Sequence, residues 1–142
     1  MQTAAIIINS MERVAQRSGD ITQAIFANYL ARCEGSRGLM SHMDQHMQGR
    51  MLEQVLLLLM EDGEEELQRY LAFETANHAS YGVEYYMYEN LFAAVQDVVY
   101  ASLSEDLTAA EKAAWQSRVQ SLLRAVESAT RRLAAPAAKA IQ

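Results

Sequence analysis

Apolar side chains recur at helical spacing along almost the whole chain. Residues 4–17 carry them at every third or fourth position, until Ser18-Gly19 interrupts the pattern. Asp20, with Gln23 three residues later, has the order of a capping box and opens a second helical run. The pattern therefore predicts two helices at the start of the chain.

Four longer runs follow a short connection that contains Gly35 and Gly38. They are expected over residues 39–60, from Glu64 to the break at Gly82, over residues 83–103, and from Thr108 to Pro136. In the first of these runs Met51 marks the centre of the expected buried face. Thr108 with Glu111 has the order of a second capping box. No alternating strand pattern interrupts these runs, so we expect an all-α fold.

Length and composition fit a single helical domain over residues 1–142. Hydrophobic residues make up 51% of the chain, and only one proline and six glycines interrupt the helix formers. The net charge of −6 and the lack of a basic stripe argue against a nucleic-acid partner, and no apolar run is long enough for a membrane span. Cys33 is the only cysteine and no secretion signal is recognisable, so we expect a cytoplasmic protein with a loose tail after about residue 134.

The candidate chemistry lies with three histidines. His42 and His46 are one turn apart, the spacing of two metal ligands on a helix, but no suitable third ligand lies near them. A zinc site is therefore not favoured. His78 stands at the end of a helical run, where residue type alone more often indicates a structural role than a ligand. The chain also lacks a phosphate-binding glycine loop and a nucleophile elbow.

The residues around and after His78 form a recognisable set. They are His78, Tyr81-Gly82-Val83, Tyr88, Thr108 and Ala113-Ala114-Trp115. In this order and spacing they resemble bacterial single-domain globins and the globin domain of flavohaemoglobins. The first half is similar through Phe26-Ala27-Asn28-Tyr29-Leu30, although Met11 falls where a tryptophan is common. The resemblance covers Ile6 to about Val126, and it implies a globin fold of six to eight helices around a haem pocket.

On this resemblance His78 takes the proximal position and binds the iron of haem b through its imidazole. Ligation requires a neutral ring whose other N–H is held by a carbonyl or a carboxylate. Tyr88 stands where flavohaemoglobin-like members place a tyrosine near this histidine, with an ordinary core position as the alternative. Their glutamate in the last helix is not matched, because Thr130 stands at its place and Glu127 lies about one turn away. Besides His78, the residues expected at the cofactor are Phe26, Met40, Met47, Gln48, Met51, Tyr81, Val83 and Tyr88.

The opposite, distal side departs from the family pattern. Met40 stands where a phenylalanine usually stacks on the haem, and its flexible thioether can fill that space. Phe26 replaces a tyrosine that donates a hydrogen bond to bound ligand, and phenylalanine cannot donate. The residue that faces the iron stays open. Counting forward from Met40 indicates Met47 as a possible sixth ligand, counting back from His78 with family spacing indicates His46, and Gln48 is chemically intermediate between these two.

Three functions follow from the resemblance. The first is reversible binding of a diatomic gas, with oxygen before nitric oxide and carbon monoxide, by a monomer or homodimer. The second is a nitric oxide dioxygenase or peroxidase-like enzyme, which would need an external reductase because the chain is too short to include one. The third is a globin-fold sensor or interaction module without haem, which Met40 and the charged Glu74 on a nominally buried stripe favour.

Overall fold

The protein is built from helices, as the sequence pattern predicts. The computed structural model describes the backbone of residues 2–61 and 63–141 and the side chains of residues 3–61 and 63–133. The elements are α1 (Gln2–Ser18), α2 (Thr22–Arg32), α3 (Ser36–Leu39), α4 (Gln45–Met60), α5 (Glu64–Ala79), α6 (Tyr85–Leu103), a 3-10 turn η1 (Ser104–Asp106) and α7 (Ala109–Ile141). The part of the chain that is described contains no strand, which confirms the all-α class. None of its helices is both long and apolar enough to cross a bilayer.

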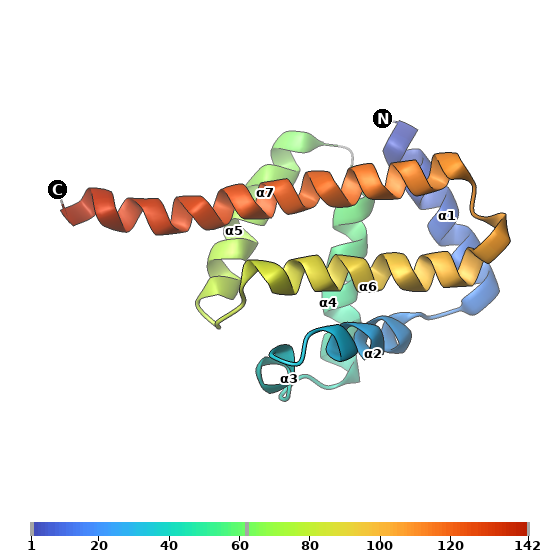
Figure 1. Ribbon diagram of the computed structural model, residues 1–142, viewed down its shortest axis with the longest axis horizontal. Helices are drawn as coiled ribbons and strands as arrows, with labels where there is room; N and C mark the ends of the chain where they lie inside the picture. Colours follow the sequence, from blue (N-terminus) through green and yellow to red (C-terminus); the bar gives the residue numbers. More distant parts are fainter. Residues whose placement is uncertain (1, 62, 142) are drawn as a thin grey trace.

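The helices cross in two main directions (Figure 1). α6 and α7 run antiparallel along the long axis of the molecule, and α4 and α5 cross them steeply. α1 packs against α4, α6 and α7, α2 packs against α4 and α6, and α5 packs against α7. α4 and α5 are not among the closely packed helix pairs of the described residues. These two helices are therefore held apart by the elements that they cross.

The prediction of one helix over residues 39–60 is wrong at its N-terminal boundary. α3 ends at Leu39, a turn follows, and α4 begins only at Gln45. The Asp44 carboxylate accepts a hydrogen bond of 2.9 Å from the Met47 amide, which satisfies a free donor in the first turn of α4. Met40 and His42 therefore lie outside α4, and His42 and His46 are not ligands on one helix.

The two expected capping boxes have different outcomes. The box at the start of α7 is confirmed, because Thr108 N donates to Glu111 Oε1 at 3.0 Å and Glu111 N donates to Thr108 Oγ1 at 3.1 Å. The box at Asp20 is wrong, since α2 begins at Thr22 and Asp20 Oδ1 accepts from the Thr22 amide at 2.9 Å. An aspartate that bonds two residues ahead forms a turn before the helix rather than a box.

The last helix is longer than the sequence indicated. The backbone of α7 continues past Pro136 to Ile141, whereas the sequence predicted an end at the proline. A proline removes one backbone donor and crowds the preceding turn, which weakens a helix without always ending it. The expectation of a loose tail after about residue 134 falls on positions whose side chains lie outside the described residues.

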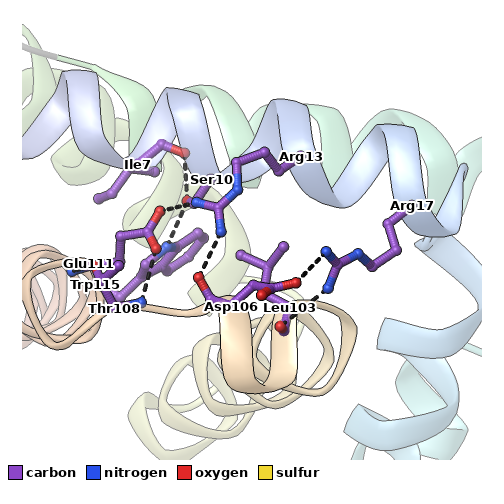
Figure 2. Close-up of polar contacts among 9 residues, drawn as sticks. All are labelled: Ile7, Ser10, Arg13, Arg17, Leu103, Asp106, Thr108, Glu111 and Trp115. Carbon is purple, nitrogen blue, oxygen red and sulfur yellow. Dashed lines mark hydrogen bonds and ion pairs between the residues drawn. The ribbon is translucent and has the colours of Figure 1, made fainter.

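One polar cluster joins α1 to the junction of α6 and α7 (Figure 2). Trp115 is completely buried, and its Nε1–H donates to Ser10 Oγ at 2.9 Å, while Ser10 Oγ donates to the Ile7 carbonyl at 2.8 Å. Arg13 binds the Glu111 carboxylate and donates to the Asp106 carbonyl at 2.8 Å. Each of these polar side chains has a partner, so the cluster fixes the packing of α1 on α7.

Candidate functional site

His78 lies in the last turn of α5 with about a third of its side chain exposed. Its Nδ1 is 2.7 Å from the carbonyl oxygen of Glu74, one turn earlier on the same helix. A carbonyl can only accept, so Nδ1 carries the proton in the neutral ring. The lone pair of the ring is then on Nε2, which has no hydrogen-bond partner among the described residues. This is the tautomer and orientation of a histidine ready to bind a metal through Nε2.

The turn after His78 fixes the main chain of the same residue. Gly82 has a φ of +89°, a conformation that glycine adopts at low energy. The Val83 amide donates to the His78 carbonyl at 3.2 Å, and the Gly82 amide donates to the Ala79 carbonyl at 3.0 Å. These two bonds are those of a Schellman motif with Gly82 at its left-handed position. The Tyr81-Gly82-Val83 segment therefore has a local physical role, which is to end α5 directly after His78.

Glu74 is a functional candidate that the sequence interpretation treated only as a misfit in a buried face. Its carboxylate oxygen Oε2 is 3.4 Å from His78 Nδ1. The same nitrogen also donates to the backbone carbonyl of Glu74. Both groups are partly buried. A carboxylate on the far nitrogen of a metal-binding imidazole increases the electron donation of that ring. The spacing of four residues between Glu74 and His78 was the available sequence signal.

Tyr88 on α6 packs beside the imidazole. The two ring centroids are 6.4 Å apart and the rings meet edge to face at 65°. The hydroxyls of Tyr88 and of the buried Thr75 are both buried without a hydrogen-bond partner among the described residues. The pKa of Tyr88 is raised, mainly because its hydroxyl is buried. The nearby Thr75 hydroxyl opposes this increase, and the negative charge of Glu74 adds to it. The expectation that Tyr88 lies near His78 is confirmed, and Thr75 joins the cluster as a residue that the sequence did not reveal.

Thr130 and Glu127, the two α7 residues compared with the family glutamate, do not belong to the cluster of His78, Glu74, Thr75 and Tyr88. Thr130 donates to the Val126 carbonyl at 2.9 Å, and Glu127 pairs with Arg131 at 3.2 Å on the same helix. The carboxylate beside His78 therefore comes from α5 itself, through Glu74.

The face of α4 that enters the core is not the expected one. Leu52, Val55 and Leu59 are buried, whereas Met51 is only partly covered. At 100° per residue, the buried face is rotated by roughly a quarter turn from Met51. The expected centre at Met51 is wrong because the packing of α4 on α1, α2 and α7 selects the other sector.

The rotation leaves a second apolar stripe on α4 that the protein itself covers only in part. Met51 and Leu58 are half-buried against the core, and Met47 is 41% exposed. Gln48 is half-buried and His46 is exposed. This stripe keeps apolar surface that a ligand could cover.

The remaining residues expected at the cofactor differ in how far each is accessible. Phe26 is buried in the core, and Met40 and Val83 are half-buried against it. Tyr81 is exposed at the turn after α5. A ligand could therefore reach Met40, Val83 and Tyr81 more readily than Phe26.

An open cavity of about 290 Å³ lies between α4 and α5. Leu57 and Leu58 line it from α4, and Leu67 and Tyr70 line it from α5. Tyr70 also donates across the gap to Gln54 Oε1 at 3.1 Å. The cavity is lined mainly by apolar atoms, but neither His78 nor any other residue expected at the cofactor lines it.

The described residues contain no group of three or more histidine, cysteine, aspartate or glutamate side chains that could hold a metal ion, at His78 or elsewhere. No protein-family model matches the sequence, and no curated protein matches it.

Proposed function

We propose that this chain is a globin-fold haem protein that binds a diatomic gas, oxygen in the first place, at iron ligated by His78. The helix arrangement supports the fold. α6 and α7 are crossed steeply by α4 and α5, and an apolar stripe that the core covers only in part runs along α4. Globins pack their helices at steep angles around a haem in this manner.

The observation that carries the proposal is the bond between His78 Nδ1 and the Glu74 carbonyl. This bond fixes the proton on Nδ1, so the lone pair on Nε2 is available to bind iron. A porphyrin would supply the other ligands of an iron held at Nε2. When bound, haem b would supply the iron that binds the gas.

The partly covered apolar residues would hold the cofactor. Met51 and Leu58 would cover it from α4, and Val83 and Tyr88 would support it on the side of His78. Phe26 and Met40 would close the apolar cage. Among these side chains only the Tyr88 hydroxyl can donate a hydrogen bond. The main effect of the apolar cage would therefore be to exclude water from the bound gas, with little polarisation of the gas by the protein. Gln48, Met47 and His46 are the α4 residues that would lie nearest the gas if the chain follows the family spacing.

Absorption spectroscopy tests this proposal. The full chain, supplied with hemin, is measured in the ferric state, after reduction with dithionite, and after addition of carbon monoxide. We expect a Soret band that sharpens and shifts with carbon monoxide, because the iron is held by one imidazole and is open to ligand. Split visible bands in the reduced form before gas is added would identify a sixth ligand from α4. A chain that stays colourless with hemin would refute the proposal and favour a signalling role without haem.

A second candidate, peroxidase-like or nitric oxide dioxygenase activity with an external reductase, is favoured by Glu74. Its carboxylate lies 3.4 Å from His78 Nδ1 and would make the imidazole a stronger electron donor. The Glu74→Gln variant keeps the backbone carbonyl but removes the negative charge. We expect it to raise the ferric–ferrous midpoint potential and to slow peroxide-dependent oxidation of guaiacol.

Glu127→Gln is the matched control for that variant, because its carboxylate pairs with Arg131 and not with His78. It should change neither the potential nor the rate. Equal potentials and equal rates in Glu74→Gln and the unaltered chain would remove the enzymatic candidate and leave gas binding untouched.

A further inference from the structure

A second cavity, of about 440 Å³, lies between α5 and α7. Leu67, Gln68 and Leu71 line it from the first half of α5, and Thr3 borders it from α1. None of these residues belongs to the His78 cluster, which is at the other end of α5. The cavity is therefore a separate feature of the molecule.

The α7 wall of this cavity is unusually basic for an acidic chain. Arg118, Arg124 and Arg132 all line it, and they face a single carboxylate, that of Glu64. The whole protein has only 12 lysine and arginine residues against 18 acidic ones. A quarter of its cations thus lies in one cavity, which makes the local potential positive although the net charge is −6.

Two of these guanidinium groups are left free by the described part of the chain. Arg124 and Arg132 make no hydrogen bond or ion pair with the described residues. Arg118 is half-buried and donates to the Glu61 carbonyl, which anchors it at the cavity wall. The cavity therefore offers one fixed guanidinium, that of Arg118, and two exposed ones that lie about 9 and 21 Å further along α7 at a rise of 1.5 Å per residue.

Hydroxyl groups complete the wall. Ser117, Ser121 and Ser128 line the cavity on the same face of α7 as the arginines, within roughly 60° of Ser121 at 100° per residue. Guanidinium groups recognise phosphate oxygens by paired, charge-assisted hydrogen bonds, and serine hydroxyls add further donors. The volume lies within the usual range of small-molecule sites.

We infer that this cavity binds a small phosphomonoester with a hydroxyl-rich body, of the sugar-phosphate class. Arg124 and Arg132, with Ser128 between them on α7, take the phosphate, while Glu64 and Gln68 accept hydrogen bonds from the hydroxyls. Glu64 would repel a ligand that carries anionic groups at both ends, so it selects for a single charged end. The inference does not depend on haem.

Isothermal titration of the full chain with glucose 6-phosphate tests it, with glucose and inorganic phosphate as comparison ligands. We expect one site per chain, weaker binding of inorganic phosphate, no binding of glucose, and an affinity that falls as salt increases. The double variant R124Q/R132Q should lose about tenfold or more in affinity, because each guanidinium contributes charge-assisted bonds.

R69Q is the matched control, since Arg69 is exposed on α5 and does not line the cavity. It should bind as the unaltered chain does, and circular dichroism checks that all variants keep their helices. No binding by the unaltered chain, or equal binding by R124Q/R132Q and R69Q, would overturn the inference. Equal affinities for glucose 6-phosphate and inorganic phosphate would overturn the assignment to sugar phosphates.

Discussion

Two regions of this small protein use polar groups in opposite ways. At the corner of α1 and α7, the Trp115 indole, the Ser10 hydroxyl and the Glu111 carboxylate each have hydrogen-bond partners (Figure 2). Around His78, the buried hydroxyls of Thr75 and Tyr88 have none among the described residues. Trp115 is fully buried, whereas His78 is about one third exposed.

The difference is the one expected between a structural region and a candidate functional one. Buried polar groups are nearly always paired in folded proteins, so a satisfied network is expected wherever packing alone is at stake. The unpaired hydroxyls of Thr75 and Tyr88 beside a one-third-exposed imidazole depart from that rule, as does the buried Tyr100 hydroxyl near the other end of α6. Only the first pair lies beside a candidate ligand-binding residue, and departures of this kind are expected where a protein holds a ligand.

The largest effect should come from the structural corner. Trp115→Ala removes a completely buried indole and should lower the free energy of unfolding by about 3–5 kcal/mol. Ser10→Ala removes the acceptor of the Trp115 N–H and the donor to the Ile7 carbonyl, and it should lower the free energy of unfolding by about 1–3 kcal/mol. Urea denaturation followed by circular dichroism measures both changes. A Ser10→Ala variant as stable as the unaltered chain would show that this network does not fix α1 on α7.

A smaller effect should come from the turn behind His78. Gly82 has a φ of +89°, and a Cβ there would meet Leu39 at 3.6 Å, an ordinary contact distance. Gly82→Ala should therefore lower the free energy of unfolding by about 1–2 kcal/mol through backbone strain alone. Because the same turn holds the His78 carbonyl, the affinity for hemin should fall as well.

Gly49→Ala is the control for this change, and its expected effect on the free energy of unfolding has the opposite sign. Gly49 lies inside α4, and a Cβ added there would have no atom within 4 Å, so alanine should raise the free energy of unfolding by about 0.5–1 kcal/mol. If both glycine variants destabilised the protein equally, strain at Gly82 would not explain the turn.

Local sequence signals predicted the helices well where the partners are close in sequence. Thr108 and Glu111 are three residues apart, and their capping box is formed. The cap at Asp44 was missed because the apolar pattern continues across residues 39–44, and only the start of α4 at Gln45 reveals the turn. Periodicity shows that a face is apolar, but it does not show where a helix begins.

The candidate site was predictable only in part for the same reason. His78 and the Gly82 turn follow from residues next to each other in the sequence. The rotation of the buried face of α4 depends on which helices pack against it, and the contact of Tyr88 with His78 joins two different helices. Glu74 was visible at one helical turn from His78, but only the structure shows that its carboxylate turns toward the imidazole.

The most direct test of the account is a hemin titration of the unaltered chain, His78→Ala and His42→Ala, followed at the Soret band. His42 is the matched control, because it is an exposed histidine in the turn before α4 and has no proposed role at the cofactor. We expect one hemin per chain for the unaltered protein and for His42→Ala. His78→Ala should bind hemin weakly, and its reduced, carbon monoxide-bound spectrum should differ from that of the unaltered chain. An unchanged affinity and spectrum in His78→Ala would contradict the account.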